Sequence, residues 1–141
     1  MNIQQLTDRS YAPYSGDKAA CIVEDQKGNR YPGIRIENVS FPLTITAVQS
    51  ALFNCISEGA KPQKIYLSDT LKDHAEYWLK EYCLETFDVE ALRDKELYLP
   101  PKSLEMPILQ MLKKLHERSQ IEHSNFPVSA LIETESGYYA G

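Results

Sequence analysis

The stretch GIRIENVSFPLTITAVQSALFNCISEG, residues 33–59, decides the fold of this chain. It opens with alternating apolar residues, passes through a polar turn, and continues into a segment whose apolar residues recur three and four positions apart. Alternation is typical of a strand, and the longer spacing is typical of a helix with one buried face. We therefore expect a strand, then a turn, then a helix that covers Leu43–Ser57. Gly59 should end this helix, because glycine readily adopts the left-handed conformation.

The flanking segments complete an α/β pattern. Two apolar runs upstream are separated by the loop DQKGN, which is too short for a crossover, so they should pair as antiparallel strands. Pro32 and Gly33 in the second run indicate an edge strand or a bulge. Downstream we expect a strand that lies parallel in the same sheet, a second helix, a weaker strand, a Pro-rich linker, a third helix and a last strand. The predicted elements are, in order, Lys18–Glu24, Arg30–Glu37, Lys64–Asp69, Thr70–Glu85, Phe87–Leu92, Glu96–Pro107, Ile108–Gln120 and Val128–Thr134.

Composition narrows the classes of partner. With 141 residues, 43% of them hydrophobic and 25% charged, the chain has enough apolar residues for a domain core, which excludes wholesale disorder. A net charge of -5 argues against binding to a nucleic-acid backbone or an anionic membrane. No apolar run approaches the roughly 18 residues of a membrane span, and the N-terminus lacks a targeting pattern, so we expect a cytoplasmic protein.

The three cysteines are expected to be buried free thiols. Cys21, Cys55 and Cys83 are far apart in the sequence, lie in apolar or helical contexts, and form no C-x-x-C pair. The sequence therefore favours neither a disulfide nor a cysteine metal cluster.

The end of the chain repeats its beginning. At a constant spacing of 109 residues, Asp8–Gly28 aligns with Glu117–Gly137 without gaps. The identical pairs are Arg9/Arg118, Ser10/Ser119, Ser15/Ser124, Glu24/Glu133 and Gly28/Gly137. The alternative is chance similarity between two helix–turn–strand units. On the repeat interpretation, residues 1–100 are one domain, 101–107 are a linker, and 108–141 are the opening helix, strand and hairpin of a second unit.

The motif order SYAPYS, strand, G-x-x-I-E-N-x-S-F, and a helix ending in I-S-E-G resembles the cytidine deaminases. These zinc enzymes hydrolyse the 4-amino group of cytidine and deoxycytidine, and the resemblance covers roughly residues 6–85. It implies an α/β fold with three α/β/α layers and a mixed sheet. It also implies a homotetramer, or a dimer of tandem-domain chains, whose subunits complete one another's active sites. In this family a zinc-bound hydroxide attacks C4, while a glutamate that is not a ligand moves protons.

The residues that carry this chemistry are absent at the matching positions. The family's C-A-E motif, with one zinc thiolate and the catalytic glutamate, falls on Thr46-Ala47-Val48. Its P-C-x-x-C motif falls on Leu71–Ala75, so that Lys72 and Ala75 stand where the other two cysteines would be. Hydroxyl, isopropyl, ammonium and methyl groups do not replace three thiolates and an acid–base group. We expect no catalytic residue, no bound metal and no cofactor here.

The nucleoside-binding positions are altered as well. The resemblance implies that the Asn and the Glu of G-x-N-x-E-N hold the ribose 3′-hydroxyl. Here Arg35 stands in the place of the first Asn, while Glu37 and Asn38 are retained. Arginine donates hydrogen bonds but accepts none. The resemblance also implies an aromatic residue beside the ligand. Asp17 takes its place in the first unit, whereas the second unit retains it as Phe126, preceded by Asn125. The candidate ligand-binding residues are therefore Arg35, Glu37, Asn38 and Phe126, although Glu37 and Asn38 also suit a structural role in tying the turn to the next helix.

Three functions fit these observations. The first is a zinc-less deaminase-family domain that supports oligomerisation, as a homo-oligomer or with a catalytic deaminase domain. The second is part of an active cytidine or deoxycytidine deaminase whose zinc site lies beyond Gly141 or in another chain. The third is a module that binds a nucleoside or nucleotide, with Arg35 available for a phosphate.

Overall fold

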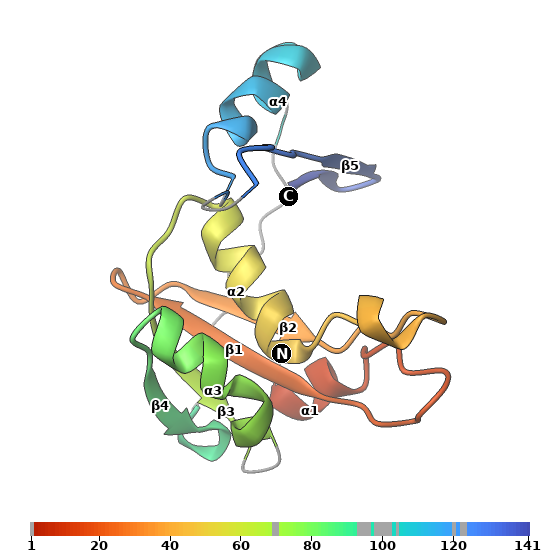
Figure 1. The fold of residues 1–141 in the computed structure, drawn as a ribbon, viewed down its shortest axis with the longest axis vertical. Helices are drawn as coiled ribbons and strands as arrows, with labels where there is room; N and C mark the ends of the chain where they lie inside the picture. The colour runs from red at the N-terminus through yellow and green to blue at the C-terminus, as the bar shows by residue number, and fades with distance from the viewer. Residues whose placement is uncertain are drawn as a thin grey trace.

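The computed structural model contains a four-stranded mixed sheet with helices on both faces and a two-stranded sheet near the C-terminus (Figure 1). It describes residues 2–68, 71–92, 97, 103, 105–119, 121 and 124–141, and side chains over the same ranges apart from residues 72–74. The elements are α1 (Ile3–Thr7), β1 (Ala20–Asp25), β2 (Arg30–Ile34), η1 (Phe41–Leu43), α2 (Ala47–Ser57), β3 (Pro62–Leu67), α3 (Lys72–Glu81), β4 (Glu85–Asp88), η3 (Val89–Ala91), α4 (Ile108–His116), β5 (Leu131–Thr134) and β6 (Gly137–Ala140). Over these ranges, no helix is both long and apolar enough to cross a membrane.

The four-stranded sheet has the order β2-β1-β3-β4. β1 is antiparallel to both of its neighbours, and β3 is parallel to β4. The predicted antiparallel pairing of the first two strands is confirmed, and β2 lies at the edge, as Pro32 indicated. β3 lies in the predicted sheet between β1 and β4. It is antiparallel to β1, parallel to β4, and runs in the same direction as β2. The reason is that α2 carries the chain from β2 across β1 before β3 begins.

Two predicted helix bounds differ from the structure for local reasons. The helix predicted from Leu43 begins at Ala47, because Ile45 pairs with Ile36 in an antiparallel bridge and the helix is capped only at the next residue. The second helix ends at Glu81, because Cys83 has a left-handed backbone with φ 50°. Its predicted first residue lies outside the described residues, as does most of the predicted linker.

The remaining bounds shift by a few residues. The strand predicted at Phe87–Leu92 is β4 at residues 85–88, followed by the η3 turn. The third helix ends at His116, where its capping residue begins a turn, and the last strand is confined to residues 131–134. Each predicted element type is present.

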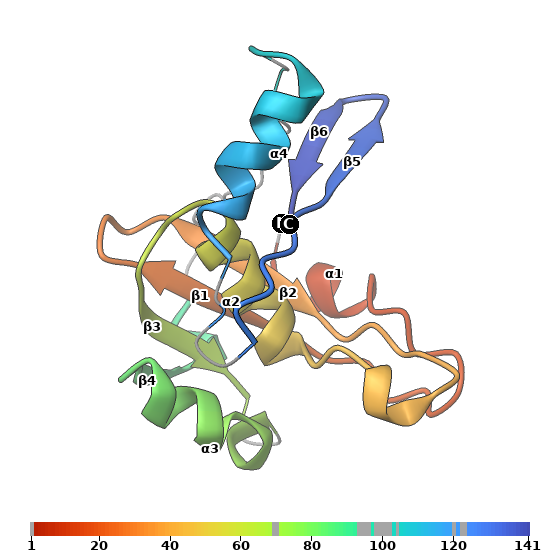
Figure 2. The same ribbon diagram turned by 45° about the horizontal axis from the view of Figure 1, so that its top comes forward.

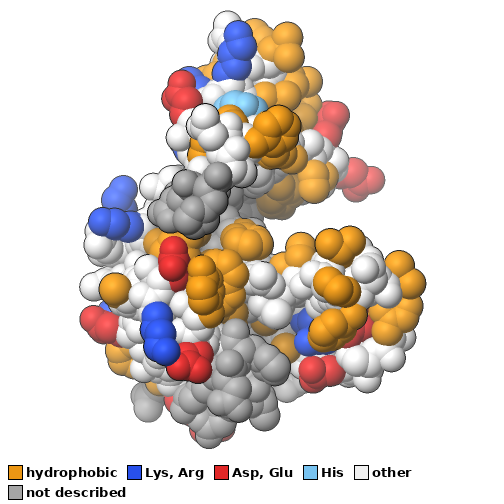
Figure 3. All heavy atoms as spheres, in the orientation of Figure 1, with side chains coloured by type: hydrophobic (Ala, Val, Ile, Leu, Met, Phe, Trp, Pro, Cys, Tyr) orange, Lys and Arg blue, Asp and Glu red, His pale blue; other side chains and the backbone are white. Residues whose placement is uncertain are grey.

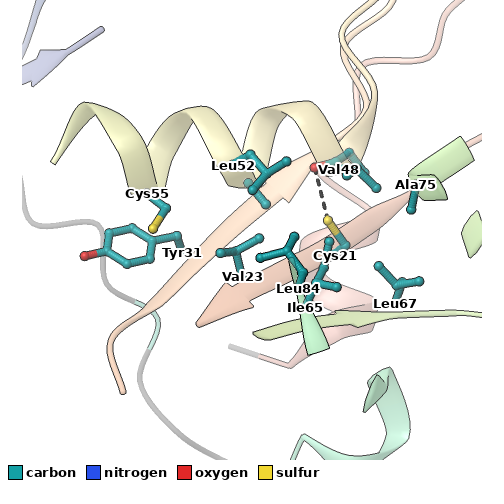
Figure 4. Close-up of a cluster of buried hydrophobic side chains, with 12 residues drawn as sticks. Cys21, Val23, Tyr31, Val48, Leu52, Cys55, Ile65, Leu67, Ala75 and Leu84 are labelled. Carbon is teal, nitrogen blue, oxygen red and sulfur yellow. Dashed lines mark hydrogen bonds between the residues drawn. The ribbon is translucent and has the colours of Figure 1, made fainter. Parts of the chain in front are cut away.

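The sheet is the middle of three layers. On one face, β1 and β3 contribute Cys21, Val23, Ile65 and Leu67, which pack against α2 and α3 in a buried cluster (Figure 4). On the other face, the alternate residues of the same strands pack with Leu6 of α1. The α/β/α layering that the resemblance implied is therefore present.

Two of the three cysteines are buried free thiols as predicted. Burial raises the pKa of Cys21 far above its usual value, and burial, with Asp25 nearby, raises the pKa of Cys55 to about 12. The prediction is wrong for Cys83, which is exposed because it lies in the turn after α3.

Helix α2 lies exceptionally close to β2 at Gly33. A Cβ atom at this position would lie 2.2 Å from the carbonyl oxygen of Ala47 and 2.2 Å from the backbone nitrogen of Ala51. Both distances are far below ordinary contact, so any side chain here would push the helix away from the sheet. Glycine on the strand and alanine on the helix are therefore matched to one another.

A buried ionic network lies on the α1 side of the sheet. Glu24 accepts hydrogen bonds from Arg30 Nε at 2.9 Å, from Lys64 Nζ at 3.3 Å and from the hydroxyl of Tyr66 at 3.2 Å. The Arg30 guanidinium also lies 5.2 Å from the centre of the Tyr66 ring. Burial alone would raise the pKa of Glu24, but the hydrogen bonds and charges of Arg30 and Lys64 outweigh it and lower the pKa.

Residues 108–141 repeat local interactions of residues 2–34 at the spacing found in the sequence. The Ser10 hydroxyl donates to the carbonyl oxygen of Ala19 at 2.7 Å, and the Ser119 hydroxyl donates to that of Val128 at 2.7 Å. These two hydroxyls tie a helix to the start of a strand in the same way.

The turns between helix and strand also correspond. The hydroxyl oxygen of Ser15 accepts from the backbone nitrogen of Asp17, and that of Ser124 accepts from the backbone nitrogen of Phe126. Left-handed backbone recurs at the spacing of 109 residues, at Gly16 and Asn125 and again at Gly28 and Gly137. The helices α1 and α4 each bury one leucine at this spacing, Leu6 and Leu115.

We predict that Glu24→Gln destabilises the chain by about 1–3 kcal/mol at pH 7, because the change weakens charge-assisted hydrogen bonds in a buried site. The folded pKa of Glu24 lies below its unfolded value, so its contribution is present above about pH 4.3 and is lost as the pH falls through the folded pKa. Urea unfolding of both proteins from pH 7 to pH 3 measures this, and the difference should shrink below about pH 4.3.

Glu76→Gln is the matched control. Glu76 pairs with Lys80 at 2.7 Å on the exposed side of α3, where an ion pair of this spacing contributes at most about 0.5 kcal/mol. Equal effects of the two substitutions would contradict the role assigned to Glu24.

Candidate functional site

The first predicted site position, Thr46, is the N-cap of α2. Its hydroxyl accepts a hydrogen bond from the backbone nitrogen of Gln49 at 3.2 Å and donates to the Gln49 side-chain oxygen at 3.0 Å. The same oxygen accepts from the Thr46 backbone nitrogen at 2.9 Å, which completes a capping box. Threonine stabilises the start of the helix in this position, and its hydroxyl is already engaged.

Val48 and Ala75 lie in the hydrophobic core. Both are 0% exposed, and both belong to the cluster that joins the sheet to α2 and α3 (Figure 4). The thiol of Cys21 donates to the carbonyl oxygen of Ala47 at 3.1 Å in the same region. The fourth position, Lys72, begins α3, and its side chain lies outside those described.

These residues do not fit a zinc ion. Zinc needs thiolate, imidazole or carboxylate ligands, whereas Val48 and Ala75 carry no donor atom and the Thr46 hydroxyl serves the helix. Cys21 lies close by, but burial raises the pKa of its thiol, so it stays protonated. Among the side chains that the structure describes, no three His, Cys, Asp or Glu residues form a group able to hold a metal.

A small cavity lies at these positions. Its volume is about 230 Å³, below the roughly 300–1,000 Å³ of most ligand pockets. Its lining is mainly apolar and consists of Ala19, Arg35, Phe41, Pro42, Thr44, Thr46, Ala47, Val48 and Leu71. The cavity therefore offers an arginine and two hydroxyls but no acid–base group.

Glu37 anchors two loops to one another. Its carboxylate accepts from the backbone nitrogens of Tyr14 at 2.9 Å and Ser15 at 3.2 Å, and also from the Ser15 hydroxyl and Arg35 Nε. The hydrogen bond from the Ser15 hydroxyl is the main cause that lowers the pKa of Glu37 to about 2, with the backbone donors and Arg35 adding to it. The carboxylate is thus occupied by donors of this chain.

Arg35 and Asp17, the two departures from the family pattern around the ligand, contact each other. Arg35 Nη1 lies 3.6 Å from Asp17 Oδ2, and Arg35 Nε lies 3.1 Å from Glu37 Oε1. The positive charge at position 35 is therefore balanced by two carboxylates. The opposite charges of positions 17 and 35 are the signal in the sequence from which this ion pair could have been predicted.

Asn38 shapes the turn that follows. Its side-chain oxygen accepts from the backbone nitrogen of Ser40 at 2.9 Å, and its backbone nitrogen donates to Thr44 Oγ1 at 3.3 Å. The suggested structural role thus divides between the two retained residues. Asn38 acts on the segment leading to α2, whereas Glu37 acts on residues 14 and 15.

The fourth ligand candidate, Phe126, is not brought to this site. It is 73% exposed and lies in the loop before β5, in the unit that meets the C-terminal end of α2. That contact is made by Arg118, whose Nη1 donates to the carbonyl oxygen of Ser57 at 3.1 Å. Arg35, Glu37 and Asn38 lie instead near the N-terminal end of α2, so the structure brings together three of the four candidates.

A larger cavity that the sequence analysis missed lies between the sheet domain and the α4–β5–β6 unit. Its volume is about 620 Å³, and Figure 3 shows the molecule hollowed between these two parts. One side carries aromatic residues of α2 and α3, and the other carries Leu115, Val128 and Gly141. Only the packing of distant segments creates this space, so no local pattern marks it.

Comparison with known proteins relates the first half of the chain to deaminases. Residues 3–68 match the family model described as the cytidine and deoxycytidylate deaminase zinc-binding region. The cytidine deaminase of Mycoplasma genitalium is 35% identical over 57 residues, 40% of this chain and 43% of its own. That of Mycoplasma pneumoniae is 34% identical over 59 residues, 42% of this chain and 44% of its own. The chain thus spans less than half of the length of these relatives.

Solved structures show the same fold. The cytidine deaminase of Mycobacterium tuberculosis superposes with a TM-score of 0.52 at 20% identity, over 60% of this chain and 76% of its own. That of Mycobacterium leprae gives a TM-score of 0.52 at 20% identity, over 62% and 82%. These similarities support the three-layer architecture described above.

We predict that Glu37→Gln increases amide hydrogen exchange at Tyr14 and Ser15, because the neutral side chain is a weaker acceptor. The folded pKa of Glu37, about 2, lies below an unfolded value of about 4.3. Its stabilising effect is therefore complete above about pH 4.3 and is lost as the pH falls towards about 2. Hydrogen exchange at neutral pH and melting curves at decreasing pH test both statements.

Asp17→Asn serves as the comparison, since the Asp17 side chain is exposed and its carboxylate pairs with the far end of Arg35, while the hydrogen bond from the Asp17 backbone nitrogen to Ser15 is retained in the variant. It should leave the exchange of Tyr14 and Ser15 close to that of the unmodified chain. Unchanged protection in the Glu37 variant would show that its carboxylate does not hold this turn.

Proposed function

We propose that the chain is a non-catalytic, zinc-less relative of the cytidine deaminases that supports oligomerisation and active-site assembly in a tandem deaminase. The match of residues 3–68 to the deaminase zinc-binding region and the shared fold support this proposal. The observation that carries the proposal is that Thr46 and Val48 both have structural roles. One caps the helix at the position of a zinc ligand, and the other fills the core at the position of the acid–base glutamate. The fold keeps the scaffold of a deaminase without the groups that perform hydrolysis.

An exposed apolar patch supports a role in assembly. Val39, Phe41 and Leu43 are exposed in the segment that leads to α2, and Tyr14 is exposed in the loop that Glu37 ties to it. Hydrophobic side chains gather on this lobe (Figure 3, right), and Phe41 also lines the small cavity. Contiguous exposed apolar groups typically mark a protein interface. We infer that this 39–43 patch contacts a second copy or a catalytic deaminase domain.

The repeated interactions support the tandem arrangement. Two serine hydroxyls, two turns and two buried leucines recur at one spacing, and chance similarity of sequence would not require shared hydrogen bonds. In this proposal residues 108–141 open a second deaminase-like unit, with residues 101–107 as the linker. The second unit keeps Asn125-Phe126, which the resemblance associates with a working ligand site.

The retained Asn125-Phe126 pair favours one alternative: the chain is part of an active cytidine deaminase whose zinc site lies in another segment or chain. A nucleotide-binding module is less well supported. Arg35 faces two carboxylates rather than an open phosphate site, and the cavity beside it is about 230 Å³.

We predict that the purified chain holds substoichiometric zinc after a chelator wash and does not reduce the absorbance of cytidine or deoxycytidine. The reason is that Thr46, Val48 and Ala75 provide no thiolate and no acid–base carboxylate. Elemental analysis and the ultraviolet assay measure the two properties, with a cytidine deaminase that has an intact C-A-E motif as the positive control. One zinc per chain together with cytidine hydrolysis would contradict the proposal.

We also predict that the chain elutes as a dimer or larger species in size-exclusion chromatography with light scattering. Leu43→Asp should shift it towards monomer, because a charge in a buried apolar interface is strongly unfavourable. Leu109→Asp, at a comparably exposed leucine of α4, should leave the mass unchanged. A monomer before substitution, or equal effects of the two variants, would contradict the interface.

A further inference from the structure

The outer edge of the four-stranded sheet is β2, and the chain itself occupies backbone groups that this edge turns outward. We propose that Pro32 and Asn54 form an edge guard, which closes β2 to pairing with the β2 strand of a second copy of this chain. The effect of the guard does not depend on the proposed function.

The backbone groups of β2 alternate between β1 and the outer edge. The Asp25 nitrogen donates to the carbonyl oxygen of Asn29 at 3.0 Å, and the Arg35 nitrogen donates to that of Ala19 at 3.0 Å. Because successive residues of an antiparallel strand point their N–H and C=O groups to opposite sides, the odd-numbered residues face β1. Positions 30, 32, 34 and 36 therefore face outward. Within the part of the chain that the structure describes, no further strand of the sheet pairs with β2 on that side.

Position 32 offers a partner strand neither a donor nor an open acceptor. Proline has no backbone N–H, and the Asn54 side-chain nitrogen donates to the carbonyl oxygen of Pro32 at 2.7 Å. Residue 32 lies between the outward positions Arg30 and Ile34, which are about 13 Å apart along an extended strand. A partner strand would have to pass over the blocked residue to bond to both.

The next outward position is occupied by another segment of the chain. The Ile36 nitrogen donates to the carbonyl oxygen of Ile45 at 3.0 Å, and the Ile45 nitrogen donates to that of Ile36 at 2.9 Å. Both outward groups of Ile36 are thus paired within the chain. Together with the guard at Pro32, this pairing leaves a partner strand no two successive outward positions between residues 30 and 36.

Helix α2 places Asn54 at the edge. Figure 2 shows this helix lying across β2, and Ala47 and Ala51 meet Gly33 at the close approach described above. Asn54 follows on the same row of the helix, three positions after Ala51, so its side chain reaches the neighbouring strand residue, Pro32. Asparagine is less favourable than alanine within a helix, and the hydrogen bond to Pro32 gives it a role at this position.

Closing this edge determines how two copies can meet. Without the guard, the β2 strands of two copies could pair antiparallel about residue 32 and join two sheets into one. Exposed strand edges of this kind are a common route to aggregation. With the guard in place, a second copy must meet this chain through side chains on another surface.

The test is to open the edge with Pro32→Val and Asn54→Ala in the same chain. The first change restores an N–H and the second frees the carbonyl oxygen of residue 32, while valine suits a strand and alanine suits a helix. The background is Leu43→Asp, so that assembly through the 39–43 patch does not mask the effect. We expect self-association at least about tenfold stronger than in the background protein, measured by light scattering over a concentration series.

Amide hydrogen exchange distinguishes strand pairing from a general loss of stability. Pairing at the edge of the double variant should slow exchange at Arg30, at residue 32 and at Ile34 as the protein concentration rises. A loss of stability alone would speed exchange at these amides, and the change would not depend on concentration.

Pro32→Val combined with Asn54→Asp is the matched control. Asn54→Asp removes the same N–H donor but adds a charge at the edge, which opposes the approach of a second strand. This variant should therefore keep the mass of the background protein. Each single substitution, Pro32→Val or Asn54→Ala, should have a smaller effect than the pair, because half of the guard remains. If Pro32→Val prevents folding, Pro32→Ala supplies the same N–H in its place.

A folded double variant with the mass of the background protein at every concentration would overturn the proposal, as would faster exchange that does not depend on concentration. Equal association of the double variants with Asn54→Asp and Asn54→Ala would also overturn it, because pairing at an edge should respond to the charge. These outcomes are separate from a failure of the proposed function. The comparison is made between variants in one background, whatever the mass of that background, and zinc content and cytidine hydrolysis are measured independently.

Discussion

The contact between α2 and β2 at Gly33 is the constraint on which the arrangement of this chain depends. The helix backbone lies so close to the strand that no side chain fits between them. This approach places Val48, Leu52 and Cys55 over the sheet, where they fill the main core. It also sets the start of α2 beside the turn that carries Glu37. The strand, turn and helix together fix the position of the first residues of α2, Thr46 to Val48, and this position does not depend on whether those residues take part in chemistry.

The positions that match the family's catalytic motif, Thr46 and Val48, have structural roles in this chain. Thr46 satisfies backbone groups at the helix start, and Val48 contributes apolar volume where a carboxylate would need partners. Arg35 and Asp17 form an ion pair at two positions where the resemblance implies ligand contacts. Each of these side chains is accommodated by its neighbours, which is compatible with the zinc-less function proposed above.

The 39–43 patch is an exposed apolar surface of this scaffold. Asn38 shapes the segment that carries it, and Glu37, whose strongly lowered pKa reflects the donors that surround it, ties the loop with Tyr14 beside it. The 39–43 patch suits an interface between whole domains.

The sequence by itself determined the strands, the main helix, the edge position of β2 and the absence of metal donors at Thr46, Val48 and Ala75, because these follow from local periodicity and residue chemistry. Tertiary structure decided the start of α2, since the bridge between Ile36 and Ile45 joins segments on either side of a turn. It also decided that Arg35 meets Asp17 and that Phe126 lies apart from Glu37. These features depend on which distant segments meet, and a one-dimensional pattern does not contain that information.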